Sequence, residues 1–445
     1  MTASTVIVYY YDDGAVLSGM TAAISSRLTD IRRRLHRFPE PAWREFRTTA
    51  TLVEELRTIG VDELAVGSDA YDPDDRMAVP SESELAPWYS RAREAGVDEE
   101  LLTRMDGGNT GVVAVLEQGA GPSIGLRVDI DGLFIEESTE SGHHPQAEGF
   151  RSETGETMHS CGHDGHMTIG LGVLEAIKES DFSGTLTVFF QPAEEESGGG
   201  NPMAQSRFAD GLDYLFAVHL GLDHPSGEVV AGIEKPLAMC HLTAEFIGTS
   251  AHAGKEPQQG DNAIQAMATA IQNIYGIPRH RDGMTRVNVG RADAGSASNV
   301  IAERAKIWGE VRGETTPLRE YMKTEFERTL YAAAETHDCD VDFNIVSESP
   351  RADSDEELAD IVYEVADGIE SVDSPVRRAA FGASEDATFL MERVQEEGGL
   401  ATYLIVGTDH PTSHHTPTFD IDERSLETGI DVLTDSILAT ADERV

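Results

Sequence analysis

Cysteine is scarce in this chain, since only Cys161, Cys240 and Cys339 occur among 445 residues. So sparse and odd a set excludes a disulfide framework and indicates a reducing compartment. The apolar runs are all too short to cross a membrane, and the N-terminus lacks the basic segment and cleavage site of a secretory signal. We therefore expect a cytoplasmic protein without a membrane partner, in which residues 1–19 are an extension of the folded chain.

Positive charge is also scarce. The 34 Lys and Arg residues face 80 Asp and Glu residues, which gives a net charge of -46, and only five of the basic residues are lysines. A field of this sign repels nucleic acid and anionic lipid, so neither is expected as a partner. Acidic surfaces poor in lysine are typical of a salt-rich cytoplasm, where ions screen self-repulsion, and we expect a halophilic protein. The alternative is an acidic protein with a basic partner, but its acidic residues recur without forming one patch.

The length and the order of patterns predict about two domains. From residue 111 to 221, strand-like runs alternate with helical ones, which favours an α/β layer with a partly parallel sheet. Residues 237–349 follow the order βαββαβ of a ferredoxin-like unit, after which α/β patterns resume. We expect one domain from residues 20–236 and 350–445 with residues 237–349 inserted into it. Residues 67–111 are polar and turn-rich, and we expect an insertion around one short helix.

The segment "MHSCGHDGH", residues 158–166, allows three interpretations. Asp164 or His163 could cap the helix that follows. Cys161 could be a nucleophile, although an activated cysteine needs a base and an orienting residue. The third interpretation is a metal site, because borderline-soft divalent metals accept thiolate, imidazole and carboxylate together.

Other ionisable residues also stand at the ends of strand-like runs. "FFQPAEE" ends on Glu194 and Glu195, "FAVHLG" carries His219, and the polar stretch "SHHTPTFD" carries His414 and His415. Separately, these could be a solvated acidic loop, a buried core histidine and surface histidines. Together they support a shared site, because ligands of α/β sheets bind beyond the carboxyl ends of the strands.

From about Ile31 onward the chain resembles the metallopeptidase family that includes aminoacylase, hippurate hydrolase, auxin-conjugate hydrolase and carboxypeptidase G, in its amidohydrolase branch with a cysteine ligand. The segments that carry the resemblance, in the family's order, are "RRLHRFPEPAWREFRT", "LRVDIDGL", "MHSCGHDGH", "FFQPAEE", "AVHLG", "GTSAHAGKEPQQGDNA", "SNVIAE", "GASEDAT" and "HHTPTFDIDE". Within the branch, the insertion at "DDRMAVP" to "GGNTGVVA" is most similar to the aminobenzoyl-glutamate hydrolases. The resemblance implies a di-metal exopeptidase-like α/β domain with an inserted dimerisation domain.

The resemblance also implies a set of site residues. Glu194 takes the position of the general base, and His415 rather than His414 aligns with the ligand because it directly precedes "TP". Asp129 and Asp164 match positions that orient ligand imidazoles, whereas His159 and His166 are interpreted as structural. The two metal ions are expected to be manganese or zinc, and their implied ligands are Cys161, His163, Glu195, His219 and His415.

In the inserted domain, His252 corresponds to a histidine that reaches across the dimer to polarise the scissile carbonyl, although it could also be a simple turn residue. Asn299 and Arg312 correspond to substrate-contact positions. The implied activity is metal-dependent hydrolysis of N-acyl amino acids, with release of glutamate from aminobenzoyl-glutamate as the first expectation. The alternatives are a broader, hippurate-like specificity, or a metal-binding subunit that is active only with a related partner. The expected assembly is a homodimer or a hetero-oligomer with such a partner.

Overall fold

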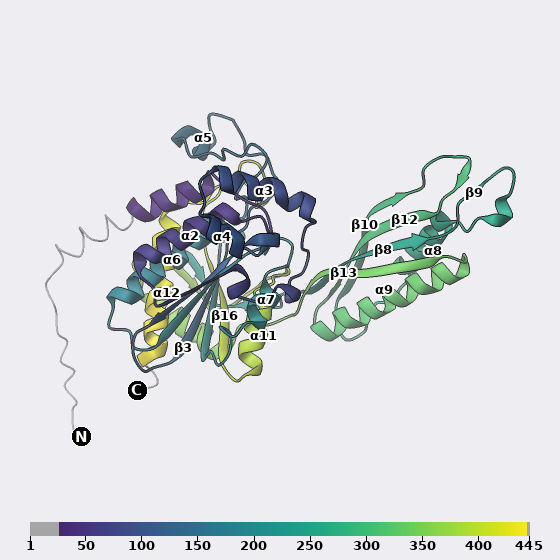
Figure 1. The fold of residues 1–445 in the computed structure, drawn as a ribbon. Helices are drawn as coiled ribbons and strands as arrows, with labels where there is room; N and C mark the ends of the chain where they lie inside the picture. Colours follow the sequence, from purple (N-terminus) through teal and green to yellow (C-terminus); the bar gives the residue numbers. More distant parts are fainter. Residues whose placement is uncertain (1–25, 443–445) are drawn as a thin grey trace, which may run out of the picture.

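The structure is a computed structural model that describes residues 26–442. The expected extension over residues 1–19 lies outside the described residues. The chain forms a broad α/β body from which an elongated second unit projects, running from β8 (Ala238–Ile247) to β13 (Asp340–Ser349) (Figure 1).

An eight-stranded mixed sheet forms the centre of the body. Its strands, in spatial order, are β1 (Glu63–Val66), β2 (Val112–Glu117), β4 (Thr185–Gln191), β3 (Ser123–Asp129), β5 (Tyr214–Leu220), β16 (Leu400–Val406), β6 (Glu228–Val230) and β14 (Ser374–Val376). The four neighbours β4, β3, β5 and β16 run parallel, while β1 and β2 pair antiparallel at one edge. The carboxyl ends of the four parallel strands therefore meet at one edge of the sheet.

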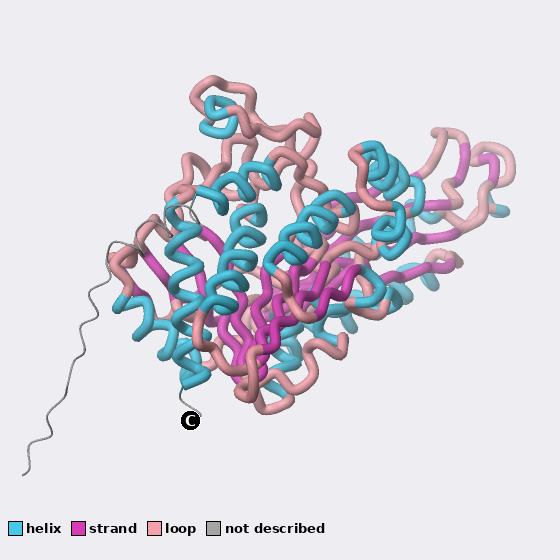
Figure 2. Tube along the Cα trace, turned by 60° about the vertical axis from the view of Figure 1, so that its left-hand side comes forward, coloured by secondary structure: helices cyan, strands magenta, loops and turns pink. Residues whose placement is uncertain are grey.

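Both faces of this sheet are buried. Alternate residues of each strand enter different apolar clusters, as Leu126 and Phe216 do on one side and Leu215 and Tyr403 on the other. The first face is covered by a helix over residues 26–36, α2 (Phe46–Ile59), α6 (His163–Glu179), α10 (Glu356–Gly368) and α12 (Arg424–Asp442), and the second by α7 (Gly200–Gln205) and α11 (Thr388–Glu396). Figure 2 shows these helices on the two sides of the strands.

The projecting unit has the expected order βαββαβ. Its elements are β8, α8 (Ala263–Tyr275), β10 (Thr285–Ala294), β12 (Arg304–Gly313), α9 (Thr316–Thr336) and β13, and the sheet order is β10-β12-β8-β13, antiparallel throughout. A short pair, β9 (Ala251–His252) with β11 (Val300–Ile301), stands at the end of the unit that is farthest from the body (Figure 1).

Some elements differ from the sequence-based expectation. Residues 67–111 contain two helices, α3 (Glu82–Glu94) and α4 (Glu99–Arg104), where one was expected, because Asp98 caps a second short helix with its side chain. Helix α7 ends at Gln205 rather than near Asp210. The short strands β1, β6 and β14, and the helix α5 (His144–Glu148), were not expected, since segments of three to five residues carry little periodicity.

Candidate metal centre

The parallel strands deliver the candidate residues to one edge of the sheet. Asp129 ends β3, Glu194 and Glu195 follow β4, and His219 is the second-last residue of β5. The loop after β16 carries His415, and α6 begins at His163 with Cys161 just before it. Residues that are far apart in sequence therefore meet because neighbouring parallel strands end together.

Potential ligand atoms of all five predicted metal ligands lie in overlapping groups. Cys161, His163 and His219 form one group and Cys161, Glu195 and His415 another, with the atoms in each group within 4.8 Å of one another. The two groups share Cys161. A third group joins His163 to Glu194 and Glu195.

The two adjacent histidines of the C-terminal loop face different neighbours. His415 places Nε2 3.3 Å from Oε2 of Glu195, whereas His414 donates from Nε2 to the carbonyl of Leu220 at 3.2 Å. Burial lowers the pKa of His414 to about 4, so that this ring is neutral. The structure thus brings His415, and not His414, to the cluster.

The hydrogen bonds of the cluster histidines fix which nitrogen is free. His219 donates from Nδ1 to the carbonyl of Leu220 at 2.8 Å, which leaves the Nε2 lone pair 3.5 Å from the thiol of Cys161. Burial and neighbouring imidazoles hold the pKa of His219 well below its usual value, so the ring is in its neutral, ligating form. His163 directs Nδ1 to Asp131 at 3.2 Å and leaves Nε2 for the carboxylates of Glu194 and Glu195, each 3.8 Å away.

Two atoms of the cluster are buried without a hydrogen-bond partner, Nε2 of His163 and Oε1 of Glu195. Buried polar atoms without partners are costly, and a cation between them would satisfy both. Burial, Glu195 and Glu194 raise the pKa of the Cys161 thiol well above its usual value, so its thiolate form requires a neighbouring cation. That environment is opposite to the one that activates a cysteine nucleophile. The residues fit divalent metal ions.

Asp129, one of the two aspartates that the resemblance implies as orienting residues, lies among these histidines. Asp129 accepts from Nδ1 of His166 at 2.5 Å and stands 3.6 Å from His163. Asp131, which the sequence analysis did not select, lies closer to His163 and also accepts the backbone N–H of Glu195 at 3.1 Å. His166 accepts the backbone N–H of Leu220 on Nε2 at 2.9 Å, which leaves it no nitrogen for a metal and agrees with a structural role.

Asp164 pairs with the N-terminal helix. Its Oδ2 lies 2.7 Å from Nε of Arg32 and 2.8 Å from Nδ1 of His36. Burial opposes ionisation of Asp164, yet these two cations hold its pKa well below the usual value. Asp164 thus fastens the helix over residues 26–36 to α6, and the structure places Asp131 in the position next to the His163 imidazole.

Glu194 faces a second buried network that the sequence analysis did not assign. Its carboxylate groups with Glu385 and Asp386, within 4.8 Å. Arg127, fully buried, reaches Asp386 at 3.0 Å and Glu385 at 3.1 Å. Burial and the charges of Glu385 and Glu195 raise the pKa of Glu194 well above its usual value, which suits a group that must take up a proton. In the sequence, only the segment "GASEDAT" indicated these carboxylates, and no local sequence pattern connects them to Arg127.

Three of the nine non-glycine residues with positive φ in the described part of the chain lie beside the cluster. Ala193, Ser197 and His415 have φ values of 55°, 50° and 59°, in a region that residues with a side chain rarely adopt. Ala193 and Ser197 flank the three consecutive glutamates. Such strain persists where the surrounding structure fixes a functional segment.

The candidate residues of the projecting unit lie in two places. His252 and Asn299 are exposed and adjacent at its far end, where Ala253 donates its N–H to the carbonyl of Asn299 at 3.0 Å. Arg312 lies at the opposite end of the unit, opposite Met239 in β8, and pairs with Glu310 at 2.8 and 2.9 Å. Within one chain, the end that carries β9 and His252 points away from the α/β body (Figure 1).

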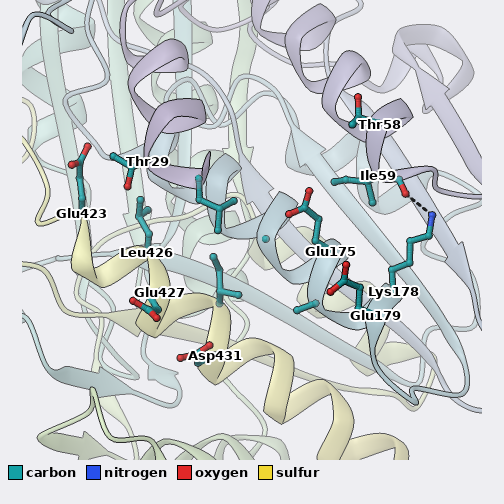
Figure 3. Close-up of a pocket in the computed structure, with 14 residues that line it drawn as sticks. Thr29, Thr58, Ile59, Glu175, Lys178, Glu179, Glu423, Leu426, Glu427 and Asp431 are labelled. Atoms are coloured by element: carbon teal, nitrogen blue, oxygen red, sulfur yellow. Dashed lines mark hydrogen bonds between the residues drawn. The ribbon is translucent and has the colours of Figure 1, made fainter. Parts of the chain in front are cut away.

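A separate cavity of about 540 Å³ lies among the helix over residues 26–36, α2, α6 and α12 (Figure 3). Its floor is apolar, and its rim carries five carboxylates, on Glu175, Glu179, Glu423, Glu427 and Asp431. The one lysine there, Lys178, donates to the carbonyls of Ile59 and Gly60. Among residues 26–442, those that line the cavity include no histidine, no cysteine and no residue of the metal centre.

Comparison with known sequences defines the family. The family model for peptidase family M20/M25/M40 matches residues 125–439, and the chain belongs to this family. It is a metal-dependent amidohydrolase of that family. No helix within residues 26–442 is long and apolar enough to cross a membrane.

Particular relatives match nearly the whole chain. Indole-3-acetyl-aspartic acid hydrolase of Enterobacter agglomerans is 38% identical over 410 residues, 91% of this chain and 94% of the relative. One of the subunits of the p-aminobenzoyl-glutamate hydrolase of Escherichia coli is 35% identical over 426 residues, 95% and 98% of the two chains. The crystal structure of an aminobenzoyl-glutamate utilization protein from Klebsiella pneumoniae matches with a TM-score of 0.82 at 31% identity, covering 95% of this chain and 98% of that one. A dinuclear metal binding M20 peptidase of Bacillus subtilis shares the fold, with a TM-score of 0.65 at 22% identity over 95% and 99% of the two chains.

Proposed function

We propose that this protein hydrolyses the amide bond of N-acyl amino acids with an aromatic acyl group and an acidic amino acid, with p-aminobenzoyl-glutamate as the first candidate. The observation that carries the proposal is the convergence of Cys161, His163, Glu195, His219 and His415 beside the carboxylate of Glu194. The substrates named for two relatives, an indole-acetyl aspartate and an aminobenzoyl glutamate, both join an aromatic acyl group to an acidic amino acid.

The proposed chemistry assigns the base to Glu194. Bound metal ions supply the Lewis acidity that makes water a nucleophile near neutral pH. Glu194 removes the proton as that water attacks the carbonyl carbon, then returns it to the leaving amine nitrogen. Glu385 and Asp386 keep the base protonatable through their negative charge, and Arg127 holds both of them in place.

We propose two ions, manganese or zinc. The thiolate of Cys161 and the imidazoles favour zinc, while the carboxylate of Glu195 is equally suited to manganese. Metal analysis of protein prepared with each ion, followed by assay of each form, distinguishes them.

We propose that the unit over residues 237–349 dimerises and that His252 and Asn299 of one chain complete the site of another. In support, both residues are exposed at the end of the unit that lies farthest from the α/β body. Arg312, nearer the body, is proposed to bind the carboxylate of the amino acid, for which it must leave Glu310. A mixture of inactive Glu194→Gln and His252→Ala chains should regain activity in mixed dimers, and no recovery would contradict completion across the dimer.

The function is tested with a panel of amides: p-aminobenzoyl-glutamate, indole-3-acetyl-aspartate, hippurate and N-acetylglutamate, each with manganese and with zinc. We expect the first two to be cleaved with the highest kcat/KM. Preference for hippurate would support the broader specificity instead, and no cleavage of any acidic amino acid amide would refute the proposal.

A second candidate function is that of a metal-binding subunit that needs a related partner, since one relative is named as a single subunit of its hydrolase. Full metal content without activity of the isolated chain, and activity on adding a related protein, would favour it.

The composition further supports a proposal that the protein works in a salt-rich cytoplasm, and unfolding midpoints that rise steeply from low to molar KCl would agree.

A further inference from the structure

Phe134 has the largest exposed share among the large apolar side chains of residues 26–442, at 59%. It lies in the segment that leaves β3 at the metal centre. Asp131, three residues before it, contacts His163. Ser138, four residues after it, donates its N–H to the carbonyl of Pro417 at 2.8 Å, two residues beyond His415. Because three residues span at most about 10 Å, the backbone of Phe134 lies close to the residues of the metal centre.

The ring of Phe134 is held in a fixed orientation. Trp88 packs edge-on against it, with ring centroids 6.1 Å apart and planes at 75°. Trp88 is itself only 5% exposed and belongs to α3, whose first turn is closed by Ser81 and Glu84 in a capping box. The guanidinium of Arg44 lies 5.2 Å from the centroid of Phe134. An exposed ring with two fixed neighbours is already ordered for binding.

Arg44 connects this ring to the base. The next residue, Glu45, accepts the N–H of Ala193 on Oε1 at 2.8 Å, directly before Glu194. Arg44 is 8% exposed and donates from Nη1 to the carbonyl of Ala42 at 2.7 Å, while its Nε has no hydrogen-bond partner and its acidic contact, Glu84, is 3.9 Å away. Arg44, which contacts Phe134, is therefore followed in the chain by a residue that bonds to the backbone next to the catalytic carboxylate.

We infer that Phe134 and Arg44 form a subsite for the aromatic ring of the acyl group, which places the amide carbonyl toward Glu194. The inference rests on the proposed function and specifies its substrate class. Aromatic rings bind one another edge to face or offset at 4.5–7 Å, and a guanidinium adds attraction to a ring face. An acetyl group has no ring to fill this place, so the subsite discriminates aryl-acyl from small acyl amides.

The test compares Phe134→Ala, Phe134→Leu and Phe134→Tyr with the parent on p-aminobenzoyl-glutamate and N-acetylglutamate, with metal content measured throughout. For Phe134→Ala we expect kcat/KM on the aryl substrate to fall roughly tenfold, mostly through KM, because ring contact and buried apolar area are both lost. Phe134→Leu should recover part of the loss and Phe134→Tyr most of it. Turnover of N-acetylglutamate and metal content should stay unchanged. An equal fall on both substrates, or no fall on either, would overturn the subsite.

Binding separates this inference from the proposed function. Calorimetry of p-aminobenzoyl-glutamate with Glu194→Gln and with Glu194→Gln/Phe134→Ala measures the subsite without turnover. We expect roughly tenfold weaker binding to the double variant, and equal binding would refute the subsite even if the parent is an efficient hydrolase. A parent that cleaves none of the amides, yet binds the aryl ligand through Phe134, would refute the function and leave the subsite standing.

Discussion

Carboxylates cluster in two regions of this molecule, and the groups that surround the carboxylates differ between the two regions. At the metal centre, Glu194 and Glu195 lie among histidines, a thiol and the buried Arg127. In the helix cavity of Figure 3, Glu179, Glu427 and Asp431 line the cavity and Lys178 donates to backbone carbonyls, whereas Glu175 and Glu423 pair with Arg27 and Arg33. Buried carboxylates need specific partners, whereas solvent and salt are sufficient for the others.

The comparison predicts its largest effect for Glu194→Gln. Removing the base should lower kcat roughly 10³-fold, because general-base catalysis contributes on this order. The matched change in the cavity, Glu179→Gln, should leave kcat unchanged. Metal content by mass spectrometry should be the same in both variants. Loss of metal from Glu194→Gln would show that Glu194 is a metal ligand and not the base.

Cys161→Ser should remove metal, since a hydroxyl is a far poorer ligand than the thiolate that the two groups share. We expect the metal-to-protein ratio to fall by about one ion or more, with activity falling in proportion. Cys339→Ser, a buried thiol of the projecting unit, is the control and should keep full metal content. A fully loaded Cys161→Ser protein would exclude Cys161 as a ligand.

Arg127→Met tests the network behind the base. It leaves Asp129, Glu385 and Asp386 buried without their cation, so the free energy of unfolding should fall by about 3–5 kcal/mol. Arg291, largely exposed, pairs with Asp293, and Arg291→Met should change stability by less than about 1 kcal/mol. Denaturant titrations of both variants measure the difference, and equal stabilities would show that the buried pairs have no special role.

The smallest effect is expected in the helix cavity. Burial, with Glu427 and Asp435 nearby, raises the pKa of Asp431 to about 6. Because the pKa is raised in the folded state, protonated Asp431 stabilises the native state fully at pH values below about 4. This stabilisation is lost as the pH rises through about 6. Between pH values of about 4 and about 6, the free energy of unfolding should therefore fall less in Asp431→Asn than in the parent. The difference between the two proteins should be less than about 1 kcal/mol, because the group is partly exposed. Parallel melting curves of the two proteins against pH would contradict this.

The sequence predicted most long elements because their periodicity is strong and local. Strands such as β3, β5 and β12, and the helices α6 and α9, fall where apolar alternation or helical spacing placed them. The short strands β1 and β14 were missed, because three or four residues become strands only through their neighbours. The candidate ligands came from a resemblance between motifs, and the structure supplied the distances among them.

The sequence by itself determined the acidic composition, the order of elements and the residue types that can hold a metal. Only the tertiary structure decided which carboxylate stands beside which cation. It placed Asp131 next to His163, brought His415 to 3.3 Å from Glu195, and put Arg127 among carboxylates more than 250 residues away. The physical reason is that these pairs form where parallel strands end side by side, and strand order in a sheet is fixed by packing across the whole core rather than by local sequence.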